Sequence, residues 1–384
     1  MSKLLEQINT GRKTFRLGEL VGVNERSITS NFSHSEIEYI DTASVVENRF
    51  NKPEILNIKQ APSRAKRLVK DGDTIISTVR PNLKHYGFIK NPNENTVVST
   101  GFVVLTPREI DPFYLFSYLT QESVTNTLAA IAEATTTTFP AFRPEVLADI
   151  EIEVPDFPMQ KKIAEILSAY DAKIENNNAI IKNLEITAQT VFDEWFVNFR
   201  FPGYEKARFV DSEMGKIPEG WGVKGVLDVI ERISPGKKYE NKTALPVGRV
   251  PILDQGASGF IGYHNDEPGV IASIENPVII FTNHTCYYRI LTEPFSCIQN
   301  VLPYVGKNGY DTFFVYFLTK EKIKMSEYKG HWPEFEHQIF IIPPIELAKG
   351  FSEKGKDIIE KIVSCEKENV ILKKTRNQLL AKLI

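Results

Sequence analysis

An internal repeat is the feature that most constrains how this chain of 384 residues can fold. Asp149–Pro155 and His337–Pro343 are each typical of a short alternating strand that stops at a proline, and their prolines lie 188 residues apart. The same offset superimposes the apolar positions of the two helical patterns that follow, with Ile163, Tyr170, Ile174, Leu184 and Val191 falling on Phe351, Ile358, Ile362, Leu372 and Leu379. We therefore expect two copies of one structural frame.

Each copy is predicted to be a mainly β globule with one or two short helices. Asp111–Leu119 resembles Asp311–Leu318 at an offset near 200, so the intervening loop is longer in the first half. Apolar runs rich in β-branched and aromatic residues predict strands at Asp73–Val79, Thr96–Leu105, Val278–Thr282 and Cys286–Leu291. The two halves thus share a frame and differ in their loops.

Each globule is followed by a long helix with a seam of apolar residues. From Ile163 to Val191, and again from Phe351 to Leu383, these residues alternate at spacings of four and three, which is typical of a coiled coil. We expect the two helices to pair antiparallel and to form a partner-binding surface through Ile163, Leu167, Tyr170, Ile174, Ile181, Ile358, Ile362, Leu372 and Leu379. The alternative is two unrelated surface helices, each docked on its own domain.

The length of the helices has a consequence for DNA. A helix of about 33 residues is about 50 Å long. This length exceeds one turn of B-DNA, about 34 Å, so one globule at each end of a helical rod could occupy each of two successive major-groove faces. Many coiled coils have no relation to DNA, so the match in length is only suggestive.

Composition excludes several classes of protein. Hydrophobic residues make up 42% of the chain and charged residues 25%, which is typical of a globular protein and not of a disordered one. The net charge is only -3, so a polyanion would have to be held by local basic patches. The sequence has no apolar stretch long enough for a membrane span and no N-terminal apolar segment, so we expect a cytoplasmic protein.

Catalytic motifs are missing. The sequence contains no phosphate-binding loop, no dinucleotide-binding glycine motif and no zinc-protease helix, and Pro343-Pro344 lacks the neighbours found in amino-methyltransferase sites. Three cysteines and six dispersed histidines suit neither a disulfide framework nor a zinc site. Asp156, Asp171 and Lys173 resemble a metal-dependent nuclease site, but the latter two project about 200° apart on a helix. We predict no catalytic residue, metal or cofactor.

The chain concentrates positive charge in one segment. Lys59–Lys90 holds eight basic and two acidic residues, whereas Glu133–Asp156 holds one basic and six acidic residues. In the basic segment, arginine suits guanine, asparagine suits adenine, and lysine or histidine suits phosphate. The DNA-binding candidates there are Arg80, Asn82, Lys84, His85 and Tyr86. A solvated hairpin without a ligand is the alternative.

Further DNA-binding candidates lie in loops that differ between the halves. Glu133–Arg143 is threonine-rich, and small hydroxyl side chains can approach phosphates and bases closely, although a plain β-edge would have the same composition. The second half has weaker equivalents in Thr282–Arg289 and Lys320–Trp332. The candidates are Thr136, Thr137, Arg143, Asn283, His284, Lys329, His331 and Trp332.

Three segments resemble a known family, the specificity (S) subunits of type I restriction-modification systems. They are Val154–Glu175 (VPDFPMQKKIAEILSAYDAKIE), Val191–Phe199 (VFDEWFVNF) and Met214–Trp221 (MGKIPEGW). The chain departs from the family at Met159, where glutamate is usual, and at Pro343–Ala348, which lacks the Glu-Gln pair. Together with the repeat, these segments cover most of the chain.

The resemblance implies an α+β chain with two target-recognition domains, each reading one half of a split double-stranded DNA sequence, separated by two antiparallel helices in a pseudo-two-fold repeat. It also implies a subunit without catalytic activity. Such a subunit recruits two modification subunits, which bind S-adenosylmethionine and methylate adenine, and through them restriction subunits that use ATP. The expected boundaries are 1–155 and 223–343 for the two domains, 156–200 and 344–384 for the helices, and 201–222 for a linker.

Two other functions remain open at this stage. A protein-interaction scaffold with a coiled coil would show no sequence-specific retention of DNA even with a methyltransferase partner present. A metal-dependent nuclease would cleave DNA with magnesium, and Asp171→Ala would abolish that cleavage. The absence of catalytic motifs weighs against the nuclease.

Overall fold

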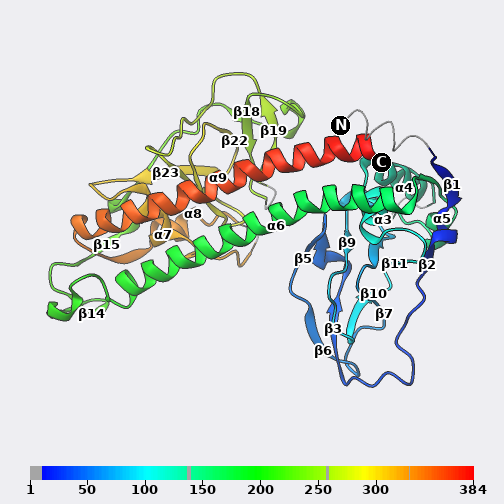
Figure 1. Ribbon diagram of the computed structural model, residues 1–384. Coiled ribbons are helices and arrows are strands. Elements are labelled where there is room, and N and C mark those ends of the chain that lie inside the picture. The colour runs from blue at the N-terminus through cyan, green and yellow to red at the C-terminus, as the bar shows by residue number, and fades with distance from the viewer. Residues whose placement is uncertain (1–10, 136–139, 257–258, 328) are drawn as a thin grey trace. The chain divides into compact units, whose positions relative to one another are not determined.

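The structure is a computed structural model that describes residues 11–135, 140–256, 259–327 and 329–384 (Figure 1). The chain divides into two compact units. Unit 1 comprises Met1–Glu175 together with Val370–Ile384, and unit 2 comprises Asn176–Asn369. Each unit therefore contains a part of both long helices, and the last residues of the chain belong to the same unit as the first.

Two four-stranded sheets form the body of unit 1. The first, which we call the frame sheet of unit 1, is entirely antiparallel and has the order β2 (Val21–Val23), β11 (Phe102–Pro107), β8 (Thr74–Ser77), β9 (Tyr86–Phe88). The second has the order β6 (Glu54–Asn57), β3 (Glu36–Ile40), β10 (Thr96–Ser99), β7 (Ala65–Leu68), and its β3 and β10 run parallel. Two antiparallel pairs complete the unit, β1 (Lys13–Arg16) with β12 (Glu151–Val154) and β4 (Val45–Val46) with β5 (Arg49–Phe50).

The single strand predicted at Thr96–Leu105 is wrong. The chain forms two strands here, β10 and β11, which belong to different sheets. They are separated by a turn at Thr100 and Gly101, and the ladder of β10 is already irregular between Val98 and Ser99. An unbroken apolar run cannot reveal such a change of sheet, because both strands are buried.

Unit 2 repeats this plan. Its frame sheet is again antiparallel, in the order β16 (Ile230–Arg232), β23 (Val301–Gly306), β20 (Val278–Thr282), β21 (Tyr288–Leu291). The second sheet has the order β17 (Lys238–Tyr239), β22 (Ser296–Ile298), β18 (Val250–Leu253), β19 (Phe260–His264). The pairs are β15 (Gly222–Gly225) with β24 (Ile339–Ile342) and β13 (Phe209–Ser212) with β14 (Gly215–Pro218). The equal strand order of the frame sheets confirms the predicted repeat.

The shorter helices are α2 (Leu17–Leu20), α3 (Pro112–Leu119), α4 (Glu122–Thr135) and α5 (Pro144–Ala148) in unit 1, and α7 (Thr312–Thr319) and α8 (Trp332–Glu336) in unit 2. Of these, α3 and α7 occupy equivalent places in their units, as do α5 and α8, which precede β12 and β24. Asp111 caps α3 by accepting hydrogen bonds from the amides of Phe113 and Tyr114, and Asp311 caps α7 in the same way through Phe313. The aspartate that opens both matched sequence segments therefore starts both helices.

The two long helices are α6 (Phe157–Phe192), which continues as a π-helical turn over Asp193–Val197, and α9 (Ile345–Leu383) (Figure 1). Within unit 2 they run antiparallel, because Asn177 contacts Asn369 while Phe192 contacts Phe351. Within unit 1 the guanidinium of Arg376 on α9 pairs with the carboxylate of Asp171 on α6. The predicted antiparallel direction is thus seen within unit 2, and within unit 1 this ion pair joins the two helices.

The cores of the two units differ in composition. Around α6 and α3, unit 1 packs mostly aliphatic side chains, among them Leu17, Leu105, Leu147, Ile163 and Leu167. The equivalent core of unit 2 is dominated by aromatic rings, among them Phe192, Phe196, Trp221, Phe281, Tyr304, Phe314, Phe317, Trp332, Phe335 and Phe351. Among the described residues, no helix is long and apolar enough to cross a lipid bilayer.

Candidate nucleic-acid interface

Four loops of unit 1 are joined at one edge by backbone hydrogen bonds. The amide of Thr100 donates to the carbonyl of Arg64 (2.8 Å), and the amide of Thr78 donates to the carbonyl of Gly101 (2.9 Å). The amide of Phe142 in turn donates to the carbonyl of Thr78 (3.0 Å). We call this edge the unit 1 ridge. Its exposed side chains are Arg64, Arg80, Asn82, Thr100 and Arg143.

Arg80 has an unusual backbone conformation on this ridge. Its φ of 47° lies in the left-handed region, and its amide is held by the carbonyl of Pro140 at 2.8 Å. A short 3-10 turn, Pro81–Leu83, follows, and Lys84 is again left-handed. A non-glycine residue in this region is strained by about 1 to 3 kcal/mol, and such strain concentrates at functional sites. The fold therefore holds the Arg80 side chain in an exposed and strained position.

The next three candidates stabilise the hairpin rather than extend from it. The ammonium of Lys84 lies 2.8 Å from the carboxylate of Glu122, and Nδ1 of His85 lies 2.6 Å from the carbonyl oxygen of Val45. Tyr86 is half-buried, and burial raises the pKa of its hydroxyl to about 12. Of the predicted set, Arg80 and Asn82 are the exposed members, whereas Lys84 would have to exchange a carboxylate for a phosphate.

Two exposed residues of the ridge were missed as candidates. Arg64 belongs to the basic segment, which gave no reason to choose it over its neighbours. Thr100 lies in the turn that the sequence analysis assigned to the interior of a strand. Thr136 and Thr137 lie outside the described residues.

Unit 2 repeats two of the three hydrogen bonds of the unit 1 ridge at equivalent positions. The amide of Asn283 donates to the carbonyl of Asn300 (2.8 Å), and the amide of His331 donates to the carbonyl of Asn283 (2.8 Å). Asn283 follows β20 as Thr78 follows β8. The carbonyl of Asn283 accepts from the segment that leads into α8, as the carbonyl of Thr78 accepts from the segment that leads into α5. We call this edge the unit 2 ridge.

A further loop supports each ridge. In unit 2 the amide of His284 donates to the side-chain oxygen of Gln255 (3.0 Å), and the guanidinium of Arg289 donates to the carbonyl of Gly256 (3.0 Å). In unit 1 the amide of Glu47 donates to the carbonyl of Lys84 (2.9 Å). Gln255 comes shortly after β18, and Glu47 lies in the turn between β4 and β5, which comes after β3.

The structure buries two of the DNA-binding candidates, His331 and Trp332. His331 is fully buried, and its two ring nitrogens lie 3.0 Å from a carboxylate oxygen of Glu334 and 3.1 Å from the carbonyl oxygen of Glu327. Trp332 is 6% exposed and lies under the guanidinium of Arg232, 4.8 Å from the ring centre. Neither side chain has a free edge for a base. Their exposed neighbour Lys329 lies 2.8 Å from a carboxylate oxygen of Glu334.

The predicted partner-binding residues lie largely inside the chain. Ile163, Leu167, Ile174 and Ile362 are buried, and the other five are half-buried. They pack in the cores of their own units because the seam of each helix faces the other helix and the adjoining sheets. The exposed apolar residues of the helices are others, namely Phe157, Ile186, Val370 and Ile371. The residues that the heptad pattern assigned to a partner thus pack mainly inside their units, and a role for them in partner binding stays a prediction.

The nuclease-like residues do not form a site. Asp171 pairs with Arg376, which leaves no open carboxylate for a metal. Within the residues that the structure describes, no group of three or more His, Cys, Asp or Glu side chains could hold a metal ion. The chemistry available at the two ridges is hydrogen bonding and charge.

Known proteins resemble this chain in sequence and in fold. Residues 9–186 match the family described as type I restriction modification DNA specificity domain. The type I restriction enzyme HindI specificity subunit of Haemophilus influenzae is 35% identical over 238 residues, which are 61% of this chain and 49% of that protein. The chain thus matches about half the length of this relative.

Two further relatives cover more of the chain. The MjaIX specificity subunit of Methanocaldococcus jannaschii is 26% identical over 337 residues, covering 81% of this chain and 76% of the relative. The crystal structure of the type I restriction-modification system S subunit from M. genitalium superimposes with a TM-score of 0.56 at 14% identity, over 98% of this chain and 96% of that one. At this identity the likeness shows the fold.

The likeness in fold to the M. genitalium S subunit agrees with the two sheet-rich units described above. Residues 9–186 thus match the type I restriction modification DNA specificity domain, and the chain is similar in sequence to type I restriction enzyme specificity subunits.

Proposed function

We propose that this chain is the DNA-recognition subunit of a type I restriction-modification complex and that it reads a target split into two halves. One observation carries the proposal. The two units build the same hydrogen-bonded ridge, and the side chains on the two ridges differ. A repeated backbone that presents unlike side chains suits two unlike half-sites, since base edges are read by side chains while the scaffold fixes their position.

The unit 1 ridge has the chemistry of direct readout. Arg64, Arg80 and Arg143 can each offer a guanidinium to guanine or phosphate, and Asn82 can offer an amide to adenine. On the unit 2 ridge we retain Asn283, His284 and Lys329 as candidates. The net charge of -3 excludes attraction by the whole molecule, so contacts must come from such local groups.

We propose that α6 and α9 set the separation between the half-sites. Both helices contribute to both units, so inserting whole helical turns would change the distance between the ridges without changing either ridge. Four residues inserted into each helix at equivalent positions should lengthen the tolerated gap between half-sites by about two base pairs, because 6 Å of helix rise matches about two 3.4 Å steps of DNA.

Recruitment of modification subunits is assigned to the exposed apolar residues of the helices. Val370 and Ile371 are 68% and 66% exposed on α9, which is unusual for two adjacent branched aliphatic side chains on a long helix. Ile371→Asp should therefore weaken assembly with modification subunits in gel filtration. Ile271→Asp, at an isoleucine that is 78% exposed in unit 2, is the matched control and should leave assembly unchanged.

The chemistry is assigned to the partners. We propose that this chain does not catalyse a reaction and that the modification subunits supply S-adenosylmethionine-dependent methylation, with ATP used by restriction subunits. Methylated adenines should be mapped in the source genome with and without the gene. Loss of methylation at one split motif supports the proposal, and an unchanged methylation map contradicts it.

A scaffold that binds only proteins is the second candidate. It is favoured by the exposed apolar residues on α6 and α9, which suit a protein partner without requiring DNA. A chain that assembles with modification subunits but retains no DNA sequence preferentially would establish it. Cleavage of DNA by the purified chain in the presence of magnesium would instead support the nuclease hypothesis.

A further inference from the structure

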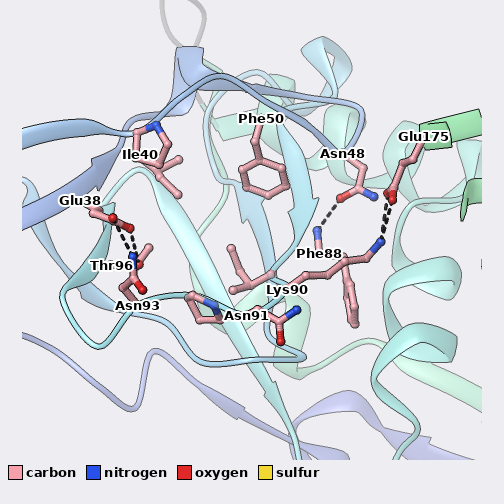
Figure 2. A pocket seen from close by; sticks show the side chains of 13 residues that line it. Glu38, Ile40, Asn48, Phe50, Phe88, Lys90, Asn91, Asn93, Thr96 and Glu175 are labelled. Carbon is pink, nitrogen blue, oxygen red and sulfur yellow. Dashed lines mark hydrogen bonds and ion pairs between the residues drawn. The ribbon is translucent and has the colours of Figure 1, made fainter. Parts of the chain in front are cut away.

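Unit 1 contains a pocket of about 340 Å³ whose role the proposed function does not explain. Figure 2 shows it in close view. Its volume is in the range that small ligands and side chains occupy. The wall consists of Glu38, Ile40, Asn48, Phe50, Pro53, Phe88, Ile89, Lys90, Asn91, Pro92, Asn93, Thr96 and Glu175.

An aromatic ring forms a fixed wall of this pocket. Phe50 is 37% exposed, although an aromatic side chain at a surface edge usually packs away from water. Its ring lies over the backbone of Gly87, where an added Cβ would come within 2.3 Å of the ring. The Asn48 side chain, two residues earlier, is also held in place, because its oxygen accepts a hydrogen bond from the amide of Phe88 (2.8 Å). The ring face is therefore presented by the fold.

The two ends of the pocket differ in charge. At one end the ammonium of Lys90 lies 3.0 Å from the carboxylate of Glu175, so these charges compensate each other. At the other end the carboxylate of Glu38 accepts hydrogen bonds from Asn93 (2.7 Å) and Thr96 (3.1 Å), which are both neutral. Figure 2 shows the Phe50 ring between these two ends. Among the described residues no cation pairs with Glu38.

We infer that this pocket binds an arginine side chain of a protein partner, with the guanidinium at Glu38 and against the ring of Phe50. A net negative lining repels phosphate, which excludes the DNA backbone as the occupant. A guanidinium is planar and weakly hydrated, pairs with carboxylates and stacks on aromatic faces, whereas an ammonium holds its water more strongly. The aliphatic stem of arginine would lie along Ile40 and Pro53.

The position of the pocket indicates which partner carries the arginine. Glu175, which pairs with Lys90 at one end of the pocket, belongs to α6. A protein bound to this part of the helix would therefore lie next to the pocket. We therefore assign the arginine to the protein that docks on the helices. This assignment of the partner rests on the proposed function, whereas the chemistry of the pocket does not.

The pocket chemistry is tested with small probes on the full-length chain. Saturation-transfer NMR should detect binding of Nα-acetyl-arginine amide to the chain. The signals of the isosteric citrulline amide and of the lysine amide should be at least fivefold weaker. Glu38→Gln and Phe50→Leu should each lower the arginine signal at least fivefold. Glu54→Gln, an exposed glutamate on β6 of the same sheet, is the matched control and should change nothing.

Equal binding of arginine and citrulline amides would overturn the charge argument, and equal binding of arginine and lysine amides would overturn the choice of guanidinium. Unchanged arginine binding by Glu38→Gln would overturn the site. Circular dichroism verifies that each variant is folded.

The partner is tested by assembly with modification subunits. Glu38→Gln should weaken assembly at least fivefold, and unchanged assembly would overturn the assignment of the arginine to that partner. Failure of the unsubstituted chain to assemble at all would count against the proposed function instead, so the two failures are distinguishable.

Discussion

The two units keep one sheet and change the other. The frame sheets have the same strand order and the same antiparallel ladders, and each carries a ridge at its edge. In the second sheets, β7 of unit 1 runs antiparallel to β10, whereas β17 of unit 2 runs parallel to the equivalent β22. The outer strands can change their direction because they lie at a sheet edge. The frame sheet holds the ridge in place in each unit, and the two units differ in the strands and loops around it.

The first prediction concerns the cores, where the largest effect is expected. Phe192 is 1% exposed and contacts Phe196, Phe314 and Phe351, so Phe192→Ala should lower the free energy of unfolding of unit 2 by about 3 to 5 kcal/mol. The three tryptophans of the chain all lie in unit 2, so urea denaturation followed by tryptophan fluorescence reports this unit.

Leu167→Ala is the matched change in unit 1. Leu167 is 1% exposed in the aliphatic core, and its truncation should shift the circular dichroism transition while the fluorescence transition keeps its midpoint. A parallel shift of the fluorescence transition would show that the two units unfold as one, and the contrast between their cores would then have no separate effect on stability.

A second prediction separates the two ridges. If Arg80 reads a base, Arg80→Ala should weaken binding to DNA with the correct first half-site by about 1 to 3 kcal/mol, and changes in the second half-site should have the same effect as in the unsubstituted chain. Arg16→Ala, at an exposed arginine on β1, is the control in filter-binding measurements. An equal loss on every sequence would identify Arg80 as a phosphate contact.

A third prediction concerns the contacts that join the helices. In unit 2 the buried amide of Asn177 donates to Glu368 (2.8 Å) and Asn369 (3.1 Å), whereas unit 1 uses the ion pair of Asp171 and Arg376. Asn177→Leu should lower the free energy of unfolding by about 1 to 3 kcal/mol, because Asn369 loses a donor in a buried place.

The double variant Asn177→Leu and Asn369→Leu should recover much of that loss in urea denaturation, because both polar groups are removed together. If the double variant is less stable than the single one, the amides stabilise the pair and do not merely specify its register. Added salt should weaken the contact in unit 1 and leave the amide contact in unit 2 unchanged.

The smallest effect is expected from pH. Burial lowers the pKa of His264, whose ring nitrogens lie 3.1 Å from the hydroxyl of Tyr239 and 2.9 Å from that of Ser296. Below its ordinary pKa of 6.5 the unfolded chain takes up a proton that the folded unit resists, so unit 2 should lose stability as the pH falls below 6.5. The slope is at most about 1.4 kcal/mol per pH unit.

The pH dependence is measured by the midpoint of the tryptophan fluorescence transition between pH 7.5 and 5.0. Asp266 opposes the effect of burial, while Lys237 and Arg249 add to it. His264→Gln should make the stability of unit 2 less dependent on pH. A dependence that persists in this variant would have to come from other groups.

Much of the frame was predictable from local sequence. The sequence match of Asp111–Leu119 with Asp311–Leu318 already pairs the two aspartates that cap α3 and α7, and the strand predicted at Val278–Thr282 has those bounds in the structure. Apolar spacing is enough to predict such elements, because it records which face is buried. The seam of the helices was also predictable, but its assignment to a partner was not, since an apolar residue pattern does not say which apolar surface covers it.

The ridges were only partly predictable. Arg80 and Asn82 were chosen for their chemistry and are exposed, whereas His331 and Trp332 were chosen for the same reason and are buried. The difference arises from tertiary hydrogen bonds between loops that are far apart in sequence, such as that from Thr100 to Arg64. Contacts of this kind leave no periodic signal.

Unit 1 is closed by the end of the chain. Leu379, Leu380 and Leu383 pack in its core, and the guanidinium of Arg12 donates to the carbonyl oxygens of Leu383 and Ile384. During translation the ribosome therefore releases the sheets of the first unit early, but their core stays incomplete until residues 370–384 have been made. A chain that ended before residue 370 would therefore leave the core of unit 1 without the leucines of α9.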